Sequence, residues 1–192
     1  MIRVLVVVLV AIVAACGVIY YMGSRQPVAH TAAVRAHFHA PPDSLFKIVA
    51  DVAAYPTWRP DVKRIEVLPP HDGHIVWRET TGNGTLEYEF TESSPPERIV
   101  STIITTDAGF TGRWRYRFLA DSGGTDVNIM EEGSVQNPIF RFAMRYVFGP
   151  YASLETYMRA LAAKTGETVT IQRVPEPLAI QSATSVATAS RW

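Results

Sequence analysis

The sequence predicts an α+β protein in which a curved, seven-stranded antiparallel sheet wraps around one long C-terminal helix, behind an N-terminal transmembrane helix. Three observations support this prediction: an uncharged N-terminal run, two-residue apolar alternation along most of residues 33–135, and helical apolar spacing after residue 150. The chain has 192 residues, which leaves room for one ordinary domain and an appendage.

The charge balance bears on the class of partner. Lys and Arg together number 18, as do Asp and Glu, so the formal net charge is zero. A protein that binds a nucleic-acid backbone needs an excess of positive charge, so we expect no nucleic-acid partner. The single cysteine, Cys16, rules out an intramolecular disulfide and a Cys-rich zinc site. The sequence contains no Gly-rich phosphate loop, and we expect no cofactor.

Residues 1–23 are predicted to form a transmembrane anchor. The run from Val4 to Tyr21 carries no charge, and extended through Gly23 it reaches about 30 Å, the thickness of the hydrocarbon core. A signal segment is the alternative, because Val13 to Cys16 resembles the lipobox at which bacterial lipoproteins are cleaved and lipidated on the cysteine. Apolar residues continue after Cys16, which favours an uncleaved anchor.

The residues that flank the apolar run indicate the membrane face. The short N-terminal flank resembles that of a signal anchor, whose start stays in the cytoplasm. We therefore expect a single-pass protein of the bacterial inner membrane whose domain faces the periplasm. A cytoplasmic domain stays open as an alternative, because Arg3 on one side is nearly matched by Arg25 and Arg35 on the other. The sequence does not indicate any protein partner.

The domain is expected to begin with a strand, a helix and a turn. Apolar and polar residues alternate along Val34–Phe38, which predicts a half-buried strand. Prolines then open a helix at Ser44–Val52, whose apolar residues lie on one stripe. A proline-bracketed turn at residues 55–60 leads to a strand at 63–68.

A hairpin and a fifth strand follow. The loop at 81–84 allows either a four-residue connection or a two-residue Asn-Gly turn, and both give pairings of the same parity. Trp77, Tyr88 and Phe90 therefore share one face of the sheet in either case. The strand at 98–105 alternates too weakly for its faces to be assigned.

The last hairpin interleaves aromatic residues with arginines. A four-residue turn at 121–124 places Trp114 opposite Glu131 on the inner face, and Arg113 opposite Glu132 on the outer face. The outer pair joins opposite charges across the strands, which stabilises a sheet by a few tenths of a kcal/mol. The same register leaves Glu131 pointing inward beside Trp114.

The C-terminal part is predicted to be helical. Asn137 and Pro138 are a cap and a first helical residue, and Gly149 with Pro150 then interrupts the helix. A stripe of apolar residues at helical spacing follows as far as Lys164. The chain then divides into an anchor at 1–23, a linker at 24–32, a domain at 33–166, and a mostly disordered tail at 167–192 with at most a short strand at 168–174.

The predicted order of elements is that of the helix-grip fold, and two motifs resemble one superfamily with that fold. Residues 50–60 (ADVAAYPTWRP), followed by a strand that ends at Leu68, and the turn GGTDV at 123–127 are similar to the START-like, Bet v 1-like or SRPBCC superfamily of polyketide cyclase/dehydrase and lipid transport proteins. The resemblance covers roughly residues 33–165. It implies the fold but not the activity, because the superfamily includes lipid carriers, quinone-binding proteins, cyclases and members without a known ligand.

A sheet curved around one helix tends to enclose a pocket, so the inward side chains are the candidate ligand-binding residues. They are aromatic or apolar, which suits a flat or chain-like apolar ligand, although the same side chains would also serve as an ordinary core. The predicted lining consists of Trp77, Tyr88, Phe90, Trp114, Tyr116, Phe118, Tyr151, Leu154 and Met158.

Glu79 and Glu131 are the weak candidates for catalytic residues. An inward carboxylate is costly unless it is paired, protonated or hydrated, and burial would raise its pKa into the range of a general acid or base. The alternatives are that both carboxylates lie at the wet rim of the sheet, or that a bulge turns Glu131 outward.

The histidines predict no metal site. His37 and His39 lie on the outer face of the first strand, and His71 and His74 bracket a loop. Neither pair has a carboxylate or cysteine beside it at ligand spacing in the sequence.

One segment before the Gly-Pro interruption is a candidate for membrane contact. It combines aromatic residues with two arginines one helical turn apart, so its arginines could meet lipid phosphates while its rings enter the interface. The alternative is that it forms the first turns of a buried helix. The candidate residues are Phe140, Arg141, Phe142 and Arg145.

These observations lead to three hypotheses on function. The first is a membrane-anchored, non-enzymatic binder or carrier of a lipid, an isoprenoid quinone or a fatty-acyl compound. The second is an enzyme similar to the polyketide cyclases, with Glu79 or Glu131 as acid/base and Tyr88 or Tyr116 as hydrogen-bond donor. The third is an interaction module of the cell envelope with a filled core and no ligand.

Overall fold

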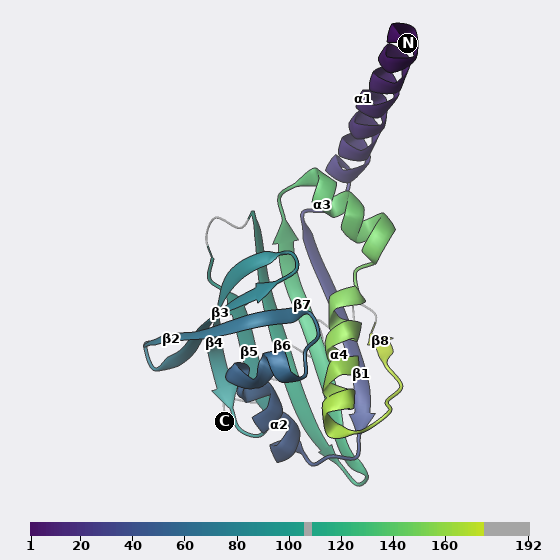
Figure 1. The fold of residues 1–192 in the computed structure, drawn as a ribbon. Helices are drawn as coiled ribbons and strands as arrows, with labels where there is room; N and C mark the ends of the chain where they lie inside the picture. Colours follow the sequence, from purple (N-terminus) through teal and green to yellow (C-terminus); the bar gives the residue numbers. More distant parts are fainter. Residues whose placement is uncertain (106–108, 175–192) are drawn as a thin grey trace.

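A computed structural model describes residues 1–105 and 109–174 of the chain, and its domain is an antiparallel sheet curved around a helix (Figure 1). The strands follow the order β2-β3-β4-β5-β6-β7-β1-β8 across the sheet. Their bounds are β1 Ala29–Phe38, β2 Val62–His71, β3 His74–Thr81, β4 Gly84–Ser94, β5 Arg98–Ile103, β6 Phe110–Asp121, β7 Gly124–Val135 and β8 Gln172–Val174.

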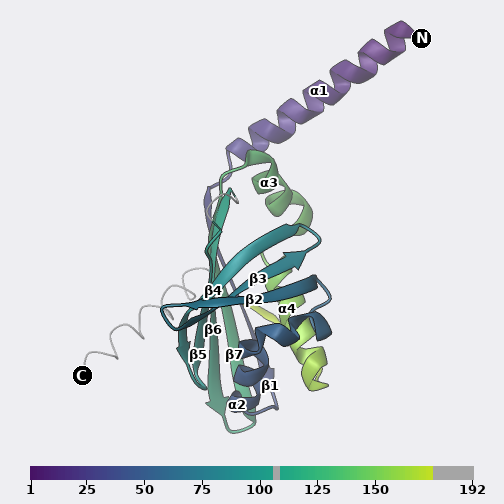
Figure 2. The ribbon, with the colours of Figure 1, turned by 60° about the vertical axis from the view of Figure 1, so that its left-hand side comes forward.

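The helices lie at the ends and on the concave face of this sheet. An N-terminal helix extends away from the domain, and the terminal helix α4 crosses the concave face (Figures 1 and 2). The helical elements are α1 Ile2–Ser24, α2 Pro42–Ala50, the 3-10 turn η1 Val52–Thr57, α3 Pro138–Ala143, the π-helical turn η2 Met144–Phe148 and α4 Ala152–Thr165. The predicted α+β helix-grip architecture is therefore present.

The β6–β7 hairpin confirms the predicted register. Trp114 pairs with Glu131, and Arg113 pairs with Glu132, around a turn that closes at Asp121. Arg113 donates to Glu132 Oε2 from Nε at 3.1 Å and from Nη2 at 2.7 Å. Alternation fixed this register because a slip of one residue would move every aromatic ring of β6 to the solvent face.

The structure differs from the predicted boundaries at the sheet edge. β1 begins at Ala29, inside the segment that the sequence assigns to a linker, because residues 29–33 pair with the end of β7. An eighth short strand, β8, pairs with β1 and extends the predicted seven strands. Residues 175–192, predicted as part of a disordered tail, lie outside the described residues.

Local sequence explains where the helices begin and end. Pro42 occupies the first turn of α2, where its missing N–H is tolerated, and the helix ends at Ala50 rather than at the predicted Val52. The Asn137 side chain caps α3 by accepting from the Ile139 amide at 2.8 Å, as predicted. Gly166 ends α4 with φ of 71°, a left-handed conformation that favours glycine.

The curvature of the sheet creates the interior. β2 and β3 run across the direction of β6 and β7, so the sheet bends around α4 (Figure 2). The residues at the end near the β6–β7 turn are tightly packed, with Phe46 and Phe118 in edge contact at a centroid distance of 5.9 Å. Fully buried members of the core include Phe38, Leu45, Val49, Phe118, Val127, Leu154 and Leu161.

α1 is the one helix among the described residues that is long and apolar enough to span a bilayer. It has 23 residues and a mean hydropathy of 3.0, and its membrane-length window is not buried by the rest of the chain. These properties fit a single-pass anchor and fit a signal sequence equally. Cys16 is exposed on this helix and forms no disulfide.

Candidate functional site

The predicted lining residues come together on the concave face of the sheet and on α4. Tyr88 and Trp114 are half-buried, as is Tyr151 at the start of α4. The others are buried, namely Trp77, Phe90, Tyr116, Phe118, Leu154 and Met158. We call the aromatic part of this surface, together with Tyr55, Trp58 and Tyr157, the inner aromatic cluster.

Tyr157 on α4 lies at the centre of the inner aromatic cluster. Its ring centroid is 5.4 Å from that of Trp58, 5.6 Å from that of Trp114 and 5.5 Å from that of Tyr116. Trp77 stacks on Tyr88 at 5.4 Å, as expected for a directly opposed cross-strand pair. The cluster therefore connects α4 with the turn after α2 and with both halves of the sheet.

An ion pair lies inside this cluster. Arg59 donates from Nη1 to Glu79 Oε2 and from Nη2 to Glu79 Oε1, both at 3.0 Å, and also from Nη2 to Asp61 Oδ2 at 2.6 Å. The Arg59 and Glu79 side chains are 11% and 4% exposed. The guanidinium carbon lies 5.0 Å from the Tyr55 ring centroid and 5.3 Å from that of Tyr157, which adds cation–π attraction.

Burial sets the ionisation of these groups. Burial raises the pKa of Glu79, and the charge of Arg59 lowers it without cancelling the rise. Burial lowers the pKa of Arg59, but the neighbouring carboxylates of Glu79 and Asp61 raise it by more. The pKa of Arg59 is therefore higher than usual, and the guanidinium stays charged. Burial also raises the pKa of Tyr116 and Tyr157, which keeps both phenols neutral.

Several buried donors of the cluster have no acceptor among the described residues. They are Nε1 of Trp58 and of Trp77, Nε of Arg59 and the hydroxyl of Tyr157, which interacts with the hydroxyls of Tyr55 and Tyr116 without reaching hydrogen-bond geometry. A buried polar group without a partner costs about 1–3 kcal/mol, so such groups call for an explanation. By contrast, the hydroxyl of Tyr55 donates to the carbonyl oxygen of Val49 at 2.7 Å.

Glu131, the second candidate carboxylate, differs from Glu79. Its side chain is 15% exposed, and no arginine pairs with it within the part of the chain that the structure describes. The Ser153 hydroxyl donates to Glu131 Oε2 at 3.2 Å, and His30 Nε2 lies 3.7 Å from Oε1. Glu131 thus lies at the half-buried end of the interior nearest α1, and it points inward as the register predicts.

Sequence reasoning missed Arg59, Trp58 and Tyr157 as members of the site. Arg59 lies in the proline-bracketed turn, whose resemblance to the family implies the fold but assigns no role to its side chains. An inward carboxylate is costly unless it is paired, protonated or hydrated, so the inward position of Glu79 is the signal that could have pointed to a cation such as Arg59. Tyr157 is one position before the predicted stripe residue Met158, and helical spacing alone does not show that both face the sheet.

The four candidate membrane-contact residues lie on α3 and η2. Phe140 and Arg145 are exposed, whereas Phe142 is half-buried with its ring 5.0 Å from that of Tyr146. Arg141 donates to the carbonyl oxygens of residues 23, 135 and 136 at 3.0–3.1 Å.

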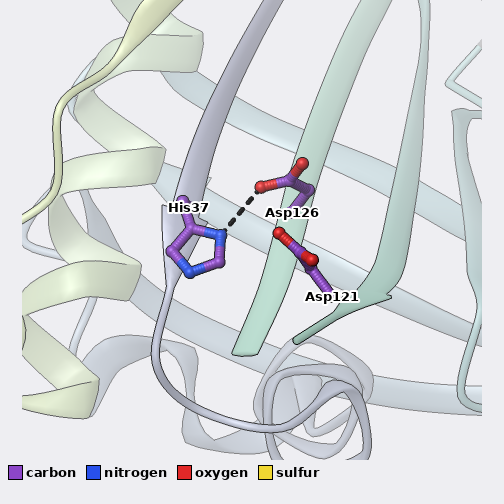
Figure 3. Close-up of side chains that lie close together, drawn as sticks. All are labelled: His37, Asp121 and Asp126. Atoms are coloured by element: carbon purple, nitrogen blue, oxygen red, sulfur yellow. Dashed lines mark hydrogen bonds and ion pairs between the residues drawn. The ribbon is translucent and has the colours of Figure 1, made fainter. Parts of the chain in front are cut away.

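His37, His71 and His74 each lie close to a carboxylate that is distant from them in the sequence. Figure 3 shows His37 on β1 beside Asp121 and Asp126, with ligand atoms within 4.8 Å of one another. All three are exposed, and His37 Nδ1 already bonds Asp126 Oδ1 at 2.9 Å. Glu89 lies 2.7 Å from His74 Nδ1 and 3.4 Å from His71 Nδ1. These carboxylates come from other strands, so the spacing of residues along the sequence does not show them, and the absence of a metal site stays a prediction.

The fold and this interior define a helix-grip protein of the START and Bet v 1-like class, in which a sheet and a terminal helix enclose an aromatic surface. Residues 29–166 match the family model for polyketide cyclase / dehydrase and lipid transport. The chain belongs to this family, as its element order and motifs predict. A search of curated proteins found no match.

Solved structures share the fold at low sequence identity. A di-domain ARO/CYC, StfQ from the steffimycin biosynthetic pathway, is 14% identical with a TM-score of 0.56 over 71% of this chain and 50% of that one. The Zhui aromatase/cyclase from Streptomyces sp. R1128 is 18% identical (TM-score 0.55, 71% and 91% covered). A START superfamily protein from Mycobacterium smegmatis is also 18% identical (TM-score 0.54, 71% and 95% covered). The chain spans about half the length of the di-domain protein.

Proposed function

We propose that the protein binds a hydrophobic small molecule with an acceptor oxygen in the inner aromatic cluster, and that α1 holds it at a membrane where such molecules reside. The observation that carries the proposal is the group of buried, unpartnered donors on Trp58, Arg59 and Tyr157 among aromatic rings. A ligand carbonyl or carboxylate would accept hydrogen bonds from these donors, which have no acceptor among the described residues.

The ligand class follows from the same surface. Aromatic walls favour a flat ring or an acyl chain, and the donors favour an oxygen that accepts without donating. A lipid, an isoprenoid quinone or a fatty-acyl compound meets both conditions. Half-buried Trp58, Tyr88 and Trp114 mark the side on which the rings would part to admit it.

The anchor part of the proposal places the domain on the periplasmic side of a bacterial inner membrane. Protease treatment of spheroplasts tests it, because digestion of the domain without lysis supports this side and protection until lysis contradicts it. Intact-mass measurement of the purified chain tests the lipoprotein alternative, in which cleavage before Cys16 and acylation of that cysteine would change the mass.

The experiment that tests binding is native mass spectrometry of the full chain, released from a membrane mimetic, followed by extraction and identification of bound molecules. We expect a stoichiometric lipid or quinone. A chain that carries nothing, and takes up nothing from a panel of lipids, quinones and fatty acids, would contradict the proposal and favour the interaction module with a filled core.

The second candidate is an enzyme of the cyclase type. Glu79 favours it, because burial raises the pKa of a carboxyl that lies beside neutral phenols. Glu79 would act as the acid/base and Tyr88 or Tyr116 as donor to a substrate carbonyl. Incubation with a poly-β-carbonyl thioester tests this role: product formed by the wild type and lost in Glu79→Gln would support it, whereas equal rates for both would exclude it.

A further inference from the structure

The segment between β7 and α4 carries a concentrated patch of exposed apolar side chains. α3 and η2 cover only 138–148, yet five large side chains in this segment are 51–66% exposed. Exposed apolar residues elsewhere in the domain, such as Val67 and Leu119, lie on separate strands. A contiguous exposed patch marks an interaction surface more often than a scattered one. The patch comprises Ile139, Phe140, Tyr146, Val147 and Phe148.

This segment is docked against the end of α1, as Figure 1 shows. The contact is close at Gly23, where a Cβ atom would lie 1.8 Å from the carbonyl oxygen of Pro138 and 3.3 Å from Cβ of Phe142. No larger residue fits at position 23 without displacing α3. The Arg141 Nε donates to the Gly23 carbonyl oxygen at 3.0 Å, at a helix end where carbonyls lack intrahelical partners.

Two further contacts fix the position of the segment. Arg141 Nη1 donates to the carbonyl oxygens of Val135 and Gln136, both at 3.1 Å. The Gln26 side chain, just beyond α1, donates to the Tyr146 hydroxyl at 3.2 Å. Arg141 therefore joins α1, the end of β7 and α3, so these three elements hold a common geometry.

We infer that α3 and η2 form an interfacial element that inserts its apolar patch into the lipid surface beside α1. This inference rests on the proposed anchor. The 23 residues of α1 extend about 34 Å, slightly more than the hydrocarbon core of about 30 Å, so its last turn lies at the interface. A segment that is docked on Gly23 must lie at the same depth, where Phe140 and Phe148 enter the boundary between headgroups and acyl chains.

A positive charge and a pocket beside the interfacial element also support contact with lipid. Arg145 is exposed and has no hydrogen-bond or ion-pair partner within residues 1–105 and 109–174, so it is free to meet lipid phosphate. A pocket of about 130 Å³ is lined by Arg145, Met144 and His30. His30 contacts Glu131, the register partner of Trp114, so this pocket lies beside the end of the interior that carries Glu131.

The test uses the full chain in vesicles that contain an anionic phospholipid such as phosphatidylglycerol. In a Cys16→Ser background, single nitroxide labels are attached at Phe148→Cys, at Leu119→Cys and at Val13→Cys. Leu119 is also an exposed apolar residue, but it lies near the β6–β7 turn at the other end of the domain. The measured quantity is the ratio of collision rates with oxygen, which concentrates in lipid, and with a water-soluble nickel chelate.

We expect a ratio at position 148 that is several-fold higher than at position 119 and lower than at position 13, which lies at the middle of α1 and therefore near the bilayer centre. Equal ratios at 148 and 119, with a high ratio at 13, would overturn the interfacial element and leave the anchor intact. A low ratio at 13 would contradict the anchor itself, and the inference would fail with it. The two failures are therefore distinguishable.

A charge reversal separates lipid contact from simple proximity. Arg145→Glu should lower the ratio at position 148 in anionic vesicles several-fold more than in neutral phosphatidylcholine vesicles. Arg64→Glu is the matched control, because Arg64 is exposed on β2 and has no hydrogen bond or ion pair with a charged group within residues 1–105 and 109–174. An equal effect of both reversals, or no effect of Arg145→Glu, would contradict contact between Arg145 and lipid phosphate.

Discussion

The two ends of the concave surface differ in burial and in polarity. Near the β6–β7 turn, Phe38, Phe118 and Val127 are buried to 2% exposure or less, and the one buried polar side chain beside them, Thr125, donates to the carbonyl oxygen of Ala40 at 2.7 Å. Toward α1, Trp114 is half-buried and Glu131 and His30 contact each other at the rim. The Arg59–Glu79 pair and its unpartnered neighbours lie among the aromatic rings of this second region. We interpret the first end as the source of stability and the second as the site of binding.

The largest expected effect is on stability, from a change at the packed end. Phe118→Ala should lower the free energy of unfolding by about 3–5 kcal/mol, because it removes a buried ring and leaves a cavity. Trp114→Ala should lower it less, because that ring is half-buried, but should abolish ligand occupancy. Chemical denaturation and native mass spectrometry of both variants measure the two quantities. If Phe118→Ala reduced occupancy more than Trp114→Ala at equal folded fraction, the division into two regions would be wrong.

The next effect concerns the ion pair. Arg59→Met leaves Glu79 buried without its cation and should cost about 3–5 kcal/mol of unfolding free energy. Glu79→Gln should cost less, because Arg59 keeps Asp61 as a partner. The double variant should recover part of the loss of Arg59→Met, since it contains no unpaired buried carboxylate. Additive losses in this cycle would show that the two side chains do not interact.

The sign of the pH dependence is set by the raised pKa of Glu79. Because the pKa is higher in the folded state, the folded chain holds this proton over a pH range in which the unfolded chain has released it. The free energy of unfolding should therefore fall as the pH rises from the ordinary pKa of a glutamate through the folded pKa of Glu79. Glu79→Gln should remove this slope in pH-dependent denaturation, and an unchanged slope would assign it to another group.

A smaller effect is expected when a buried tyrosine hydroxyl is removed, and it should differ between Tyr55, whose hydroxyl donates a hydrogen bond, and Tyr157, whose hydroxyl has no acceptor among the described residues. Tyr55→Phe removes a hydrogen bond to Val49 and should cost about 1 kcal/mol, without changing ligand affinity. Tyr157→Phe removes a buried hydroxyl without an acceptor in hydrogen-bond geometry among the described residues, so the protein without ligand should be unchanged or slightly more stable, while ligand affinity falls. Thermal unfolding and ligand titration of both variants make the comparison. The same result for both tyrosines would contradict the proposed role of Tyr157.

The smallest effect on stability is expected for the exposed pair of His37 and Asp126, which lies outside the inner aromatic cluster. A hydrogen bond to Asp126 raises the pKa of His37. This pair should therefore add stability that is fully present below the unfolded pKa of histidine and lost as the pH rises through the higher folded pKa. Asp126→Asn should remove that dependence without affecting ligand occupancy. NMR titration of the His37 ring checks the direction, and a lowered pKa in the wild type would contradict it.

The sequence predicted contacts between residues that are close along the chain better than contacts between distant segments. The β6–β7 register was predictable because the Asp-Ser-Gly-Gly turn and the Trp-Arg-Tyr-Arg alternation lie within one hairpin. The cap at Asn137 and the break at Gly149 were predictable for the same reason. The extension of β1 back to Ala29 was not, because it depends on pairing with the distant end of β7.

The site was predictable only in part. The nine lining residues lie together because they alternate on strands or repeat on α4, but their role in binding stays a prediction. Arg59 was missed because its partner, Glu79, is 20 residues away on a strand that the turn approaches only in the folded chain. The carboxylates beside His37 and His74 were missed for a similar reason, since both come from neighbouring strands.

The central claim is that the inner aromatic cluster accepts a hydrophobic molecule through its oxygen. The most direct test is a tryptophan-fluorescence titration of the full chain with a long-chain fatty acid, an isoprenoid quinone and a hydrocarbon of equal length. We predict that at least one of the oxygen-bearing ligands binds about tenfold or more tightly than the hydrocarbon, because one hydrogen bond to a buried donor is worth about 1–3 kcal/mol. Equal affinity for all three, or no binding of any, would contradict the account.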